Sequence, residues 1–557
     1  MTRLDLDIDR LIAGWRGPLL AALVALLAAL PGLIAMPPLD RTEARFAQAT
    51  AQILEHDDWL DLRFQDRPVE DSSPAVHWLQ AASVRLFSGD EARQIWPYRL
   101  PSLLGAMLAA AACAWGAARF WGQRAGTAAG IMLGAGFMLS TLGFVATADA
   151  LLCGLLTVAM AALSRLYAAA REGRRLERRT RLVFWLALAI SVLVKGPVGL
   201  LLVAAALATL AIWDRRIGWI GRLGWVWGVI LLIAAGGPWA LAVTVNTDAD
   251  FWRGAAVDLW NGLGGDGRHT AWPGAHLAAL PLLFYPATLL LAAALVAAWR
   301  RREETGVRFA VAWLVPAWIV FELIPGKLPH YVLPLYPALA WLAAAALTEN
   351  LPRRAIWGGV ALSSIAAVAL SVICVWLLGR YGNASDPIYV TIAVGFLLVG
   401  VFVGAWFMLN REVLTALMLT CVMGVMAHAA MVGGLIPQLK PLFPARTLER
   451  TLDRTGLDPR DGIAPGPVTV AGFSAPSLVF LLGTATEIGG AEAAADAIAE
   501  GRPAVVEQRL ADAFTARLAE RGLKAEAVAE FRAYDYARGE PILLTVYRPT
   551  RPQGASR

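Results

Sequence analysis

The sequence is poor in charge and in cysteine for its length. Charged residues make up 17% of its 557 residues and hydrophobic residues 58%, whereas an ordinary soluble domain is about 25% charged and about 45–50% apolar. This composition excludes a chain built only of ordinary soluble domains. The four cysteines all lie inside apolar runs, which predicts small side chains in helix packing and neither a disulfide framework nor a CxxC metal site. They are Cys113, Cys153, Cys374 and Cys421.

Several sequence patterns are also absent. No glycine-rich phosphate loop joins a strand to a helix, and no GxSxG motif occurs, which argues against a nucleotide-dependent reaction in the cytoplasm. The ten-residue alternation of an outer-membrane barrel is missing as well. The formal net charge of +6 comes mostly from arginines in short loops, so it indicates membrane topology and no nucleic-acid partner.

Apolar runs of about twenty residues, long enough to cross a bilayer core of about 30 Å as helices, fill most of the chain. We therefore expect an all-α polytopic membrane domain over 1–436 with about thirteen transmembrane helices. The fifth and sixth spans are separated only by Lys195-Gly196-Pro197 and could form one broken helix. The first span has no small-residue cleavage site after it and is expected to be a retained anchor. The expected spans are 17–36, 97–119, 124–143, 145–168, 181–194, 196–213, 222–244, 276–299, 307–324, 332–349, 355–378, 388–408 and 412–436.

The placement of arginine predicts the orientation of these spans. One set of short loops is rich in arginine, whereas the opposite short loops carry only Lys195, Lys327 and Arg380. Because cytoplasmic loops are enriched in lysine and arginine, the arginine-rich side is predicted to be cytoplasmic. We expect a multi-pass protein of a bacterial inner membrane.

Three longer segments then fall outside the cytoplasm: a first loop over 37–96, a second over 245–275 and a tail over 437–557. In the first loop, RTEARFAQATAQILEHDDW has the apolar spacing of a helix on the membrane surface. In the tail, the valine-rich runs PVTVAGF and PILLTVY flank the helical pattern EQRLADAFTARLAERG. The tail is therefore predicted to be a small, soluble, periplasmic α/β domain.

Ionisable residues at the outer ends of the spans are the first candidates for a site. Asp149 begins the fourth span, where a carboxylate costs a few kcal/mol unless it faces water or a partner; a helix cap is the alternative interpretation. Lys195 lies in one cationic segment of the same face, and Lys327, His330 and Tyr331 lie in another. A lipid phosphate is a natural partner for these groups, and snorkelling to headgroups is the alternative.

The outer loops supply further candidates. Asp40, Glu43 and Arg45 follow the first span, where a membrane-embedded substrate would be met. His269 and His276 lie at the second loop and, with a carboxylate from the first loop, could bind a zinc-like divalent metal. A hydrogen-bonded loop histidine is the alternative.

Several motifs resemble those of one known family. In chain order they are TEARFAQAT, RFQD followed by WLQAASVRLF, YRLPSLLGA, TADALL, KGPVGLLL and GKLPHYVLPLYPALA. From about residue 30 to 440 the sequence resembles the bacterial lipid A aminoarabinose transferases and their protein-mannosyltransferase-like relatives, which have the GT-C fold. The tail is similar to the periplasmic domain of that family.

The resemblance implies a glycosyltransferase. The donor would be a sugar linked to undecaprenyl phosphate or another polyprenyl phosphate, and the acceptor an envelope glycolipid such as lipid A, or another periplasmic acceptor, at the outer leaflet. An acceptor oxygen would attack the anomeric carbon, a carboxylate would take its proton and cations would hold the departing lipid phosphate. By position, Arg45, Lys327 and Tyr331 would lie near that phosphate, Asp149 matches an acidic residue of the family, and His269 matches a histidine linked to metal in some relatives.

The chain departs from the family at two positions. Thr42 stands where relatives usually have the favoured catalytic aspartate, so Asp40 or Glu43 would have to substitute, and Ser72 or Ser73 replaces a lysine. The alternative hypothesis is therefore a catalytically altered or inactive GT-C-fold protein that binds polyprenyl phosphate or scaffolds envelope assembly. A transporter is the third hypothesis, although the paired helix interruptions typical of transporters are not seen.

Overall fold

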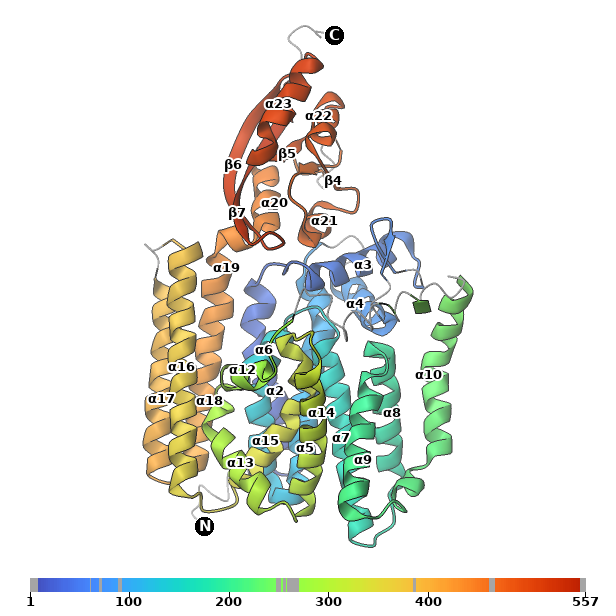
Figure 1. The fold of residues 1–557 in the computed structure, drawn as a ribbon, viewed down its shortest axis with the longest axis vertical. Coiled ribbons are helices and arrows are strands. Elements are labelled where there is room, and N and C mark those ends of the chain that lie inside the picture. The colour runs from blue at the N-terminus through green and yellow to red at the C-terminus, as the bar shows by residue number, and fades with distance from the viewer. Residues whose placement is uncertain are drawn as a thin grey trace.

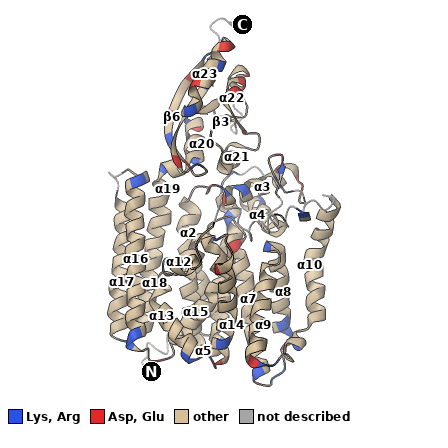
Figure 2. Cartoon of the chain, viewed as in Figure 1, with Lys and Arg blue, Asp and Glu red and all other residues tan. Residues whose placement is uncertain are grey.

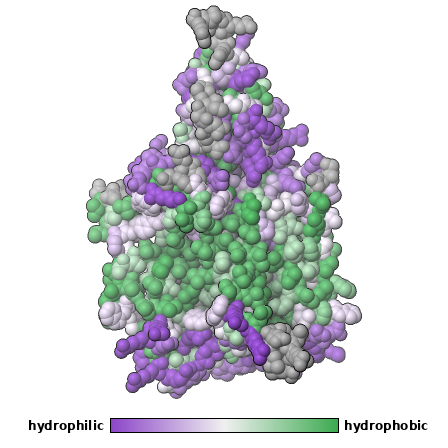
Figure 3. All heavy atoms as spheres, turned by 180° about the vertical axis from the view of Figure 1, so that it is seen from behind, coloured by the Kyte–Doolittle hydropathy of each residue, from purple (hydrophilic) through white to green (hydrophobic). Residues whose placement is uncertain are grey.

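A computed structural model of the chain shows a helical bundle that carries a small sheet domain at one end (Figure 1). It describes residues 9–60, 62–69, 73–88, 93–246, 252–253, 257, 270–383, 387–459 and 466–550. Lysines and arginines gather at the end of the bundle opposite the sheet domain, among other places (Figure 2). An apolar belt lies between two polar ends (Figure 3). This distribution is the one expected of a protein that spans a bilayer.

Each expected span is matched by a helix or by consecutive helices, and the all-α polytopic prediction is confirmed. By length and composition, eight of the described helices can cross a membrane on their own, or nine if one bent pair is counted. The remaining ones are shorter or more charged. The helices are α2 (Arg16–Ala35), α5 (Trp96–Gly134), α6 (Phe137–Leu142), α7 (Asp149–Arg171), α8 (Arg178–Lys195), α9 (Val198–Asp214), α10 (Trp225–Asn246), α12 (Ala275–Leu283), α13 (Leu291–Arg300), α14 (Thr305–Leu323), α15 (Tyr336–Ala346), α16 (Arg353–Tyr381), α17 (Ile388–Leu409) and α18 (Val413–Ala430).

Glycine and proline explain where the observed helices differ from the expected spans. The second and third spans are merged in α5 but are broken at Gly122, whose φ of 82° a side chain would rarely allow. Gly196, with φ 60°, likewise separates α8 from α9, so the fifth and sixth spans are two helices. The eighth span is bent by 114° between α12 and α13, close to Pro281 and Pro286.

Close packing of α5 against α7 fixes the position of the first residue of α7 along the axis of the bundle. A Cβ atom on Gly105 would lie 2.4 Å from the Cα of Leu151, and one on Gly154 would lie 2.4 Å from the carbonyl oxygen of Gly105. Small residues permit such close approach of helices in membranes. Asp149, at the start of α7, is thereby held beside the first turns of α5.

The first outer loop forms two helices, α3 (Thr42–His56) and α4 (Pro74–Phe87), and two very short strands, β1 (Arg63–Phe64) and β2 (Arg67–Pro68). The predicted helix in TEARFAQATAQILEH is thus present. Both helices lie across the end of the bundle, between it and the sheet domain (Figure 1). The loop therefore lies between the two larger parts of the molecule.

The tail folds as an α/β domain, as predicted. Its five strands have the order β4-β3-β5-β7-β6, in which β3 pairs in parallel with β4 and β5, and β7 pairs antiparallel with β5 and β6. PVTVAGF contains β3, and PILLTVY lies in β7. The elements are α20 (Pro444–Thr455), β3 (Thr469–Ala471), α21 (Pro476–Leu482), β4 (Glu487–Gly489), α22 (Ala491–Ala499), β5 (Ala504–Glu507), α23 (Ala511–Glu520), β6 (Ala525–Asp535) and β7 (Glu540–Pro549).

Arg93 joins the first outer loop to this domain. Its guanidinium donates to the side chain of Gln48 at 2.6 Å, to the carbonyl oxygen of Phe480 at 3.2 Å and to the hydroxyl of Thr484 at 3.1 Å. It also forms an ion pair with Glu55. One side chain thus ties α3 to the end of α21.

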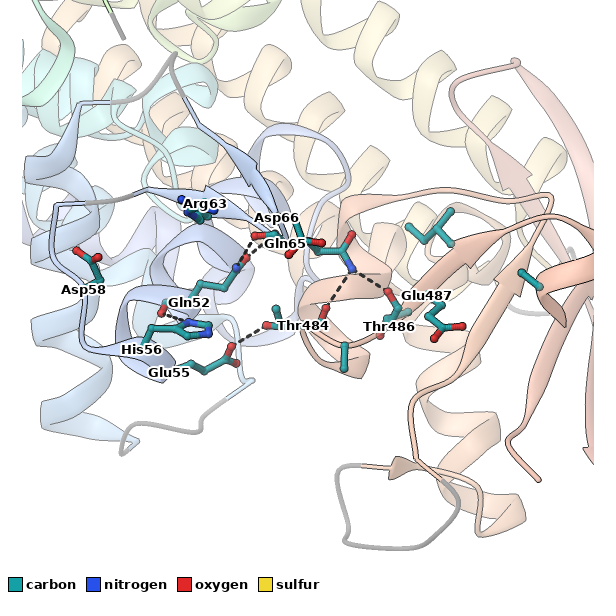
Figure 4. A pocket seen from close by; sticks show the side chains of 13 residues that line it. Gln52, Glu55, His56, Asp58, Arg63, Gln65, Asp66, Thr484, Thr486 and Glu487 are labelled. Atoms are coloured by element: carbon teal, nitrogen blue, oxygen red, sulfur yellow. Dashed lines mark hydrogen bonds between the residues drawn. The ribbon is translucent and has the colours of Figure 1, made fainter. Parts of the chain in front are cut away.

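A cleft of about 1000 Å³ lies beside this joint, between the loop and the domain (Figure 4). The amide of Gln65 crosses it to donate to the carbonyl oxygens of Thr484 at 3.0 Å and Thr486 at 2.7 Å. Most of its lining side chains are polar, including Glu55 and Glu487. Hydrogen bonds across the cleft fix the domain relative to α3.

We expect Arg93→Ala to loosen this joint, because α3, α21 and the turn at Thr484 lose a shared hydrogen-bond donor. Hydrogen–deuterium exchange of the full-length protein should be faster over 476–486 and α3. Arg85→Ala is a matched control, since Arg85 pairs with the exposed Asp57 inside the loop, and it should leave 476–486 unchanged. Unaltered exchange in Arg93→Ala would show that other contacts suffice to hold the sheet domain against the first outer loop.

Candidate functional site

Asp149, Lys195 and His330 meet at the end of the bundle nearest the sheet domain. Lys195, the last residue of α8, forms an ion pair with Oδ1 of Asp149, the first residue of α7. Nε2 of His330 lies 3.9 Å from Oδ2 of Asp149, and the hydroxyl of Thr147 donates to the same oxygen at 3.0 Å. The ring of Tyr331 lies edge-on to that of His330, with centroids 5.2 Å apart. The structure thus brings together residues that the sequence placed on one face.

The geometry bears on both alternative interpretations of these charges. Helix α7 has no side-chain hydrogen bond at its N-cap, so Asp149 does not act as a cap. Lys195 pairs with Asp149 and does not only extend toward headgroups, and 36% of its side chain remains exposed. An ammonium group has three N–H donors, so Lys195 can reach an incoming anion while it still contacts Asp149.

The first outer loop lies next to this cluster. Phe46 of α3 packs against an apolar cluster that includes Ala148 and Val194, the residues that precede Asp149 and Lys195. Arg45 is therefore on a helix beside the cluster, where it is half-buried, and Thr42 is exposed at the start of the same helix. Helix α4 lies over the ends of α7 and α8 (Figure 1).

Glu43, a candidate catalytic carboxylate, is fully buried, and both of its carboxylate oxygens accept hydrogen bonds. It forms a two-armed ion pair with Arg99, with both N–O distances 2.8 Å. It also accepts from the backbone N–H of Leu39 and of Ala146, each at 2.8 Å. Its carboxylate joins α3, α5 and the segment before α7, so its geometry is that of a structural residue. The predicted catalytic role of Glu43 stays a prediction.

Arg99 was not singled out from the sequence, although it lies in the motif YRLPSLLGA. Its side chain is 0% exposed and that of Glu43 is 1% exposed. The guanidinium also donates to the carbonyl oxygens of Met36 at 2.7 Å and Pro37 at 2.9 Å, which end the α2 segment. The sequence could have indicated that Arg99 has buried partners, because an arginine at the start of a membrane span is costly without them.

Two other predicted residues hold the backbone in place. The ammonium of Lys327 is buried and donates to the carbonyl oxygens of Ala271 at 3.1 Å and Ile324 at 2.6 Å. Among the described residues, no hydrogen bond or ion pair joins it to Asp149 or Lys195. Asp40 accepts from the backbone N–H of Ser477 at 3.1 Å, at the start of α21. Burial raises the pKa of the Asp40 carboxyl, and the hydrogen bonds from Ser477 oppose that rise.

The predicted metal ligand, His269, lies outside the described residues. His276 is buried, with Nε2 3.1 Å from the carbonyl oxygen of Leu328 and Nδ1 3.6 Å from Glu322, which fits the hydrogen-bonded interpretation. Among the described residues there is no group of three or more histidine, cysteine or acidic side chains that could hold a metal ion. The metal prediction is therefore untested.

His77 is a second residue that sequence reasoning missed. It is fully buried, and its Nδ1 lies 2.8 Å from the hydroxyl of Thr50, which donates to Gln80 at 2.7 Å. The amide of Gln80 in turn donates to the carbonyl oxygen of Ala146 at 3.3 Å. Burial lowers the pKa of His77 to about 4, so this link between α3 and α4 is neutral at pH 7. Its apolar helical context in the sequence gave no signal of this network.

The comparisons with known proteins agree with this architecture. Residues 67–240 match the family described as dolichyl-phosphate-mannose-protein mannosyltransferase. The chain is 26% identical over 377 residues to an undecaprenyl phosphate-alpha-4-amino-4-deoxy-L-arabinose arabinosyl transferase of Erwinia tasmaniensis, covering 64% of each chain. It is 28% identical over 389 residues to the protein of that name from Pseudomonas paraeruginosa, covering 65% of each. The alignments thus span about 65% of the length of these relatives.

Among solved structures, ArnT from Cupriavidus metallidurans bound to undecaprenyl phosphate superposes with a TM-score of 0.72 and 19% identity, covering 95% of this chain and 97% of that one. This likeness establishes the fold. The chain is thus a polytopic membrane protein with a GT-C-like fold and a charged site beside its first outer loop. The chain is similar in sequence to the aminoarabinose transferases, so the resemblance seen in the sequence motifs is confirmed.

We expect the Glu43–Arg99 pair to be required for stability. Removing one partner of a buried ion pair costs about 3–5 kcal/mol, so Glu43→Ala and Arg99→Ala should each lower the thermal unfolding midpoint in detergent strongly. The double variant should lose less than the sum of the two, since neither charge is then left unpaired. A Glu43→Gln variant with wild-type stability but no activity would instead assign Glu43 to catalysis.

Acid should destabilise the protein through His77. Its pKa is about 4 in the folded protein, against an ordinary value of 6.5. Between these two values the unfolded chain binds a proton there that the folded chain does not, so stability is present above pH 6.5 and falls as the pH is lowered toward 4. Thermal unfolding of His77→Gln should depend less on pH in this window than that of the wild type. His56→Gln, which alters an exposed histidine of the same loop, should behave like the wild type; equal slopes in all three would remove His77 as the cause.

Proposed function

We propose that this chain is a membrane glycosyltransferase that moves a sugar from a polyprenyl-phosphate donor to a lipid A-like envelope glycolipid. The observation that carries the proposal is the Asp149–Lys195 pair, with His330 beside it, at the helix ends under α4. A carboxylate and a partly exposed ammonium are the two groups that such a transfer requires. The names of the relatives support undecaprenyl phosphate as the donor lipid and an aminoarabinose as the sugar.

The proposal places the protein in a bacterial inner membrane with the sheet domain in the periplasm. Its support is the arginine-rich end of the bundle, which lies opposite the sheet domain (Figure 2) and is expected in the cytoplasm. The Asp149 cluster then lies at the periplasmic boundary, where the headgroup of a lipid-linked donor and an acceptor glycolipid can both reach it.

The chemistry follows from the positions of the two charged groups. Lys195 would donate hydrogen bonds to the donor phosphate, and Arg45, His330 and Tyr331 would line the approach. The carboxylate of Asp149 would take the proton of the attacking acceptor hydroxyl. The new bond joins that oxygen to the anomeric carbon, while the bond from the anomeric carbon to the phosphate oxygen breaks. The electron pair stays on the lipid phosphate, whose added charge Lys195 balances.

Asp149 is the best placed of the three predicted carboxylates. Glu43 is occupied by Arg99 and two backbone donors, and Asp40 faces the sheet domain through Ser477. Lys327 would act indirectly by holding the backbone at the second outer loop. Any divalent metal would involve His269, and the steps above do not depend on one.

Thr42 favours a second candidate, a protein that binds polyprenyl phosphate without transferring sugar. It is exposed at the start of α3, and a threonine hydroxyl cannot serve as a base near neutral pH. A carboxylate at this position would lie on the same helix as Arg45.

The test is sugar transfer in proteoliposomes that contain undecaprenyl-phosphate-linked aminoarabinose and lipid A. Asp149→Asn should lower kcat by about 10²–10⁴-fold, the usual contribution of a general base. Lys195→Met should also impair transfer, and it should weaken donor binding. Asp512→Asn and Lys524→Met, in the sheet domain, are matched controls and should retain activity.

The same assay separates the two candidates. Transfer by the natural chain that Asp149→Asn abolishes supports the transferase. Transfer that appears only after Thr42→Asp, with donor binding by the natural chain, supports the binding protein. Neither transfer nor donor binding in any variant would contradict both.

A further inference from the structure

A second cationic pocket lies at the end of the bundle opposite the sheet domain. It has a volume of about 330 Å³ and is formed by the C-terminal ends of α7 and α9 together with the short helix η1 (Ile220–Leu223). The side chains that matter are Arg171, Asp214, Arg216, Trp219 and Arg222. It is remote from Asp149, because α7 crosses the bundle between them (Figure 1).

The acidic residue of this pocket is already occupied. Asp214 accepts from the hydroxyl of Tyr167 at 2.6 Å and from Arg171 at 3.1 Å, and it pairs with Arg308. Two arginines and a tyrosine thus share one carboxylate. Asp214 therefore cannot neutralise the other arginines of the pocket.

The other donors of the pocket lack partners. Within the described parts of the chain, the guanidinium groups of Arg216 and Arg222 have no ion pair or hydrogen-bond acceptor, and both residues are exposed. Trp219 is only 9% exposed, and its indole N–H has no hydrogen-bond partner among the described residues. Buried polar groups normally have a partner. Three unpartnered donors around one concavity indicate an anionic ligand.

The surroundings of the pocket identify the kind of anion. Ile212, Ile217, Trp225 and Trp227 lie close to it in the sequence and are exposed, three of them by more than 70%. Exposed tryptophans of this kind mark the boundary between the hydrocarbon core and the headgroups. The pocket therefore opens where lipid phosphates lie.

We propose that this pocket binds the phosphate of an anionic phospholipid in the leaflet opposite the Asp149 site. Arg216 and Arg222 would bind the phosphate oxygens, since guanidinium groups match phosphate geometry, and Trp219 would donate its N–H. Basic pockets between membrane helices are a known mode of headgroup binding. The site is independent of the proposed transferase activity, because no residue is shared.

Native mass spectrometry of the full-length protein in detergent tests the proposal. The protein is titrated separately with phosphatidylglycerol, phosphatidylcholine and inorganic phosphate. Arg216→Gln combined with Arg222→Gln should weaken phosphatidylglycerol binding by about tenfold or more, since a hydrogen bond to a charged group is worth that much. Trp219→Phe keeps an aromatic ring but removes the N–H, and it should weaken binding by a smaller factor.

Arg178→Gln combined with Arg179→Gln is the matched control, because it removes the same charge from exposed residues at the same end of the bundle, outside the pocket. It should change binding less than twofold. Equal losses in the two double variants, binding of inorganic phosphate alone, or equal binding of phosphatidylcholine would each overturn the proposal. If the Arg216→Gln, Arg222→Gln variant unfolds, the test rests on Trp219→Phe. Phosphatidylglycerol binding by Trp219→Phe that equals the wild type would then count against the site.

Discussion

The buried ion pair of Glu43 and Arg99 is the contact on which the outer end of the molecule depends. It links the first turn of α3 to the first turn of α5, and it also holds the backbone at Ala146 and at the end of α2. Two charges without water are costly unless every lone pair and proton is used, and here almost all are. The outer loop is therefore fixed to the bundle at the point where α7 begins, which sets the position of Asp149.

The other parts of the outer end are positioned by further contacts, one layer on the next. Close packing of Gly105 and Gly154 sets α7 against α5, and α8 brings Lys195 to the same level. Above them, α3 and α4 are joined by the neutral network of His77, and Arg93 ties that layer to the sheet domain. The molecule is thus a stack of three parts in which the outer loop contacts both of the others.

Much of this fold could be predicted from the sequence, because a helix that crosses a bilayer needs an apolar segment of about twenty residues. The spans, the surface helix in TEARFAQATAQILEH and the α/β tail each had a periodic pattern. The co-location of Asp149, Lys195 and His330 was predictable as well, since each is an ionisable residue at the same end of an apolar run. Their contacts rest on the structure, while the roles assigned to them rest on the proposal.

Pairings between distant residues could not be predicted. From the sequence, Glu43 is a candidate catalyst because it lies just past the first span. Its ion-pair partner Arg99, 56 residues away, cannot be identified from the sequence. Lys327 reads as a phosphate ligand for the same reason, since two backbone carbonyls that only the fold brings near occupy its ammonium. Buried polar chains such as that of His77 depend on three-dimensional packing and leave no periodic signal.

The pairing of Asp149 with Lys195 has a consequence for the site before any anion is bound. While no anion is bound, each group neutralises the other, so the carboxylate is a poor proton acceptor for stray water. A phosphate that binds the remaining ammonium hydrogens shares the positive charge of the lysine, so that charge stabilises the carboxylate less and the aspartate becomes a stronger base. Under the proposed function, arrival of the donor phosphate would thus strengthen the base only at a site that already holds a lipid-linked sugar.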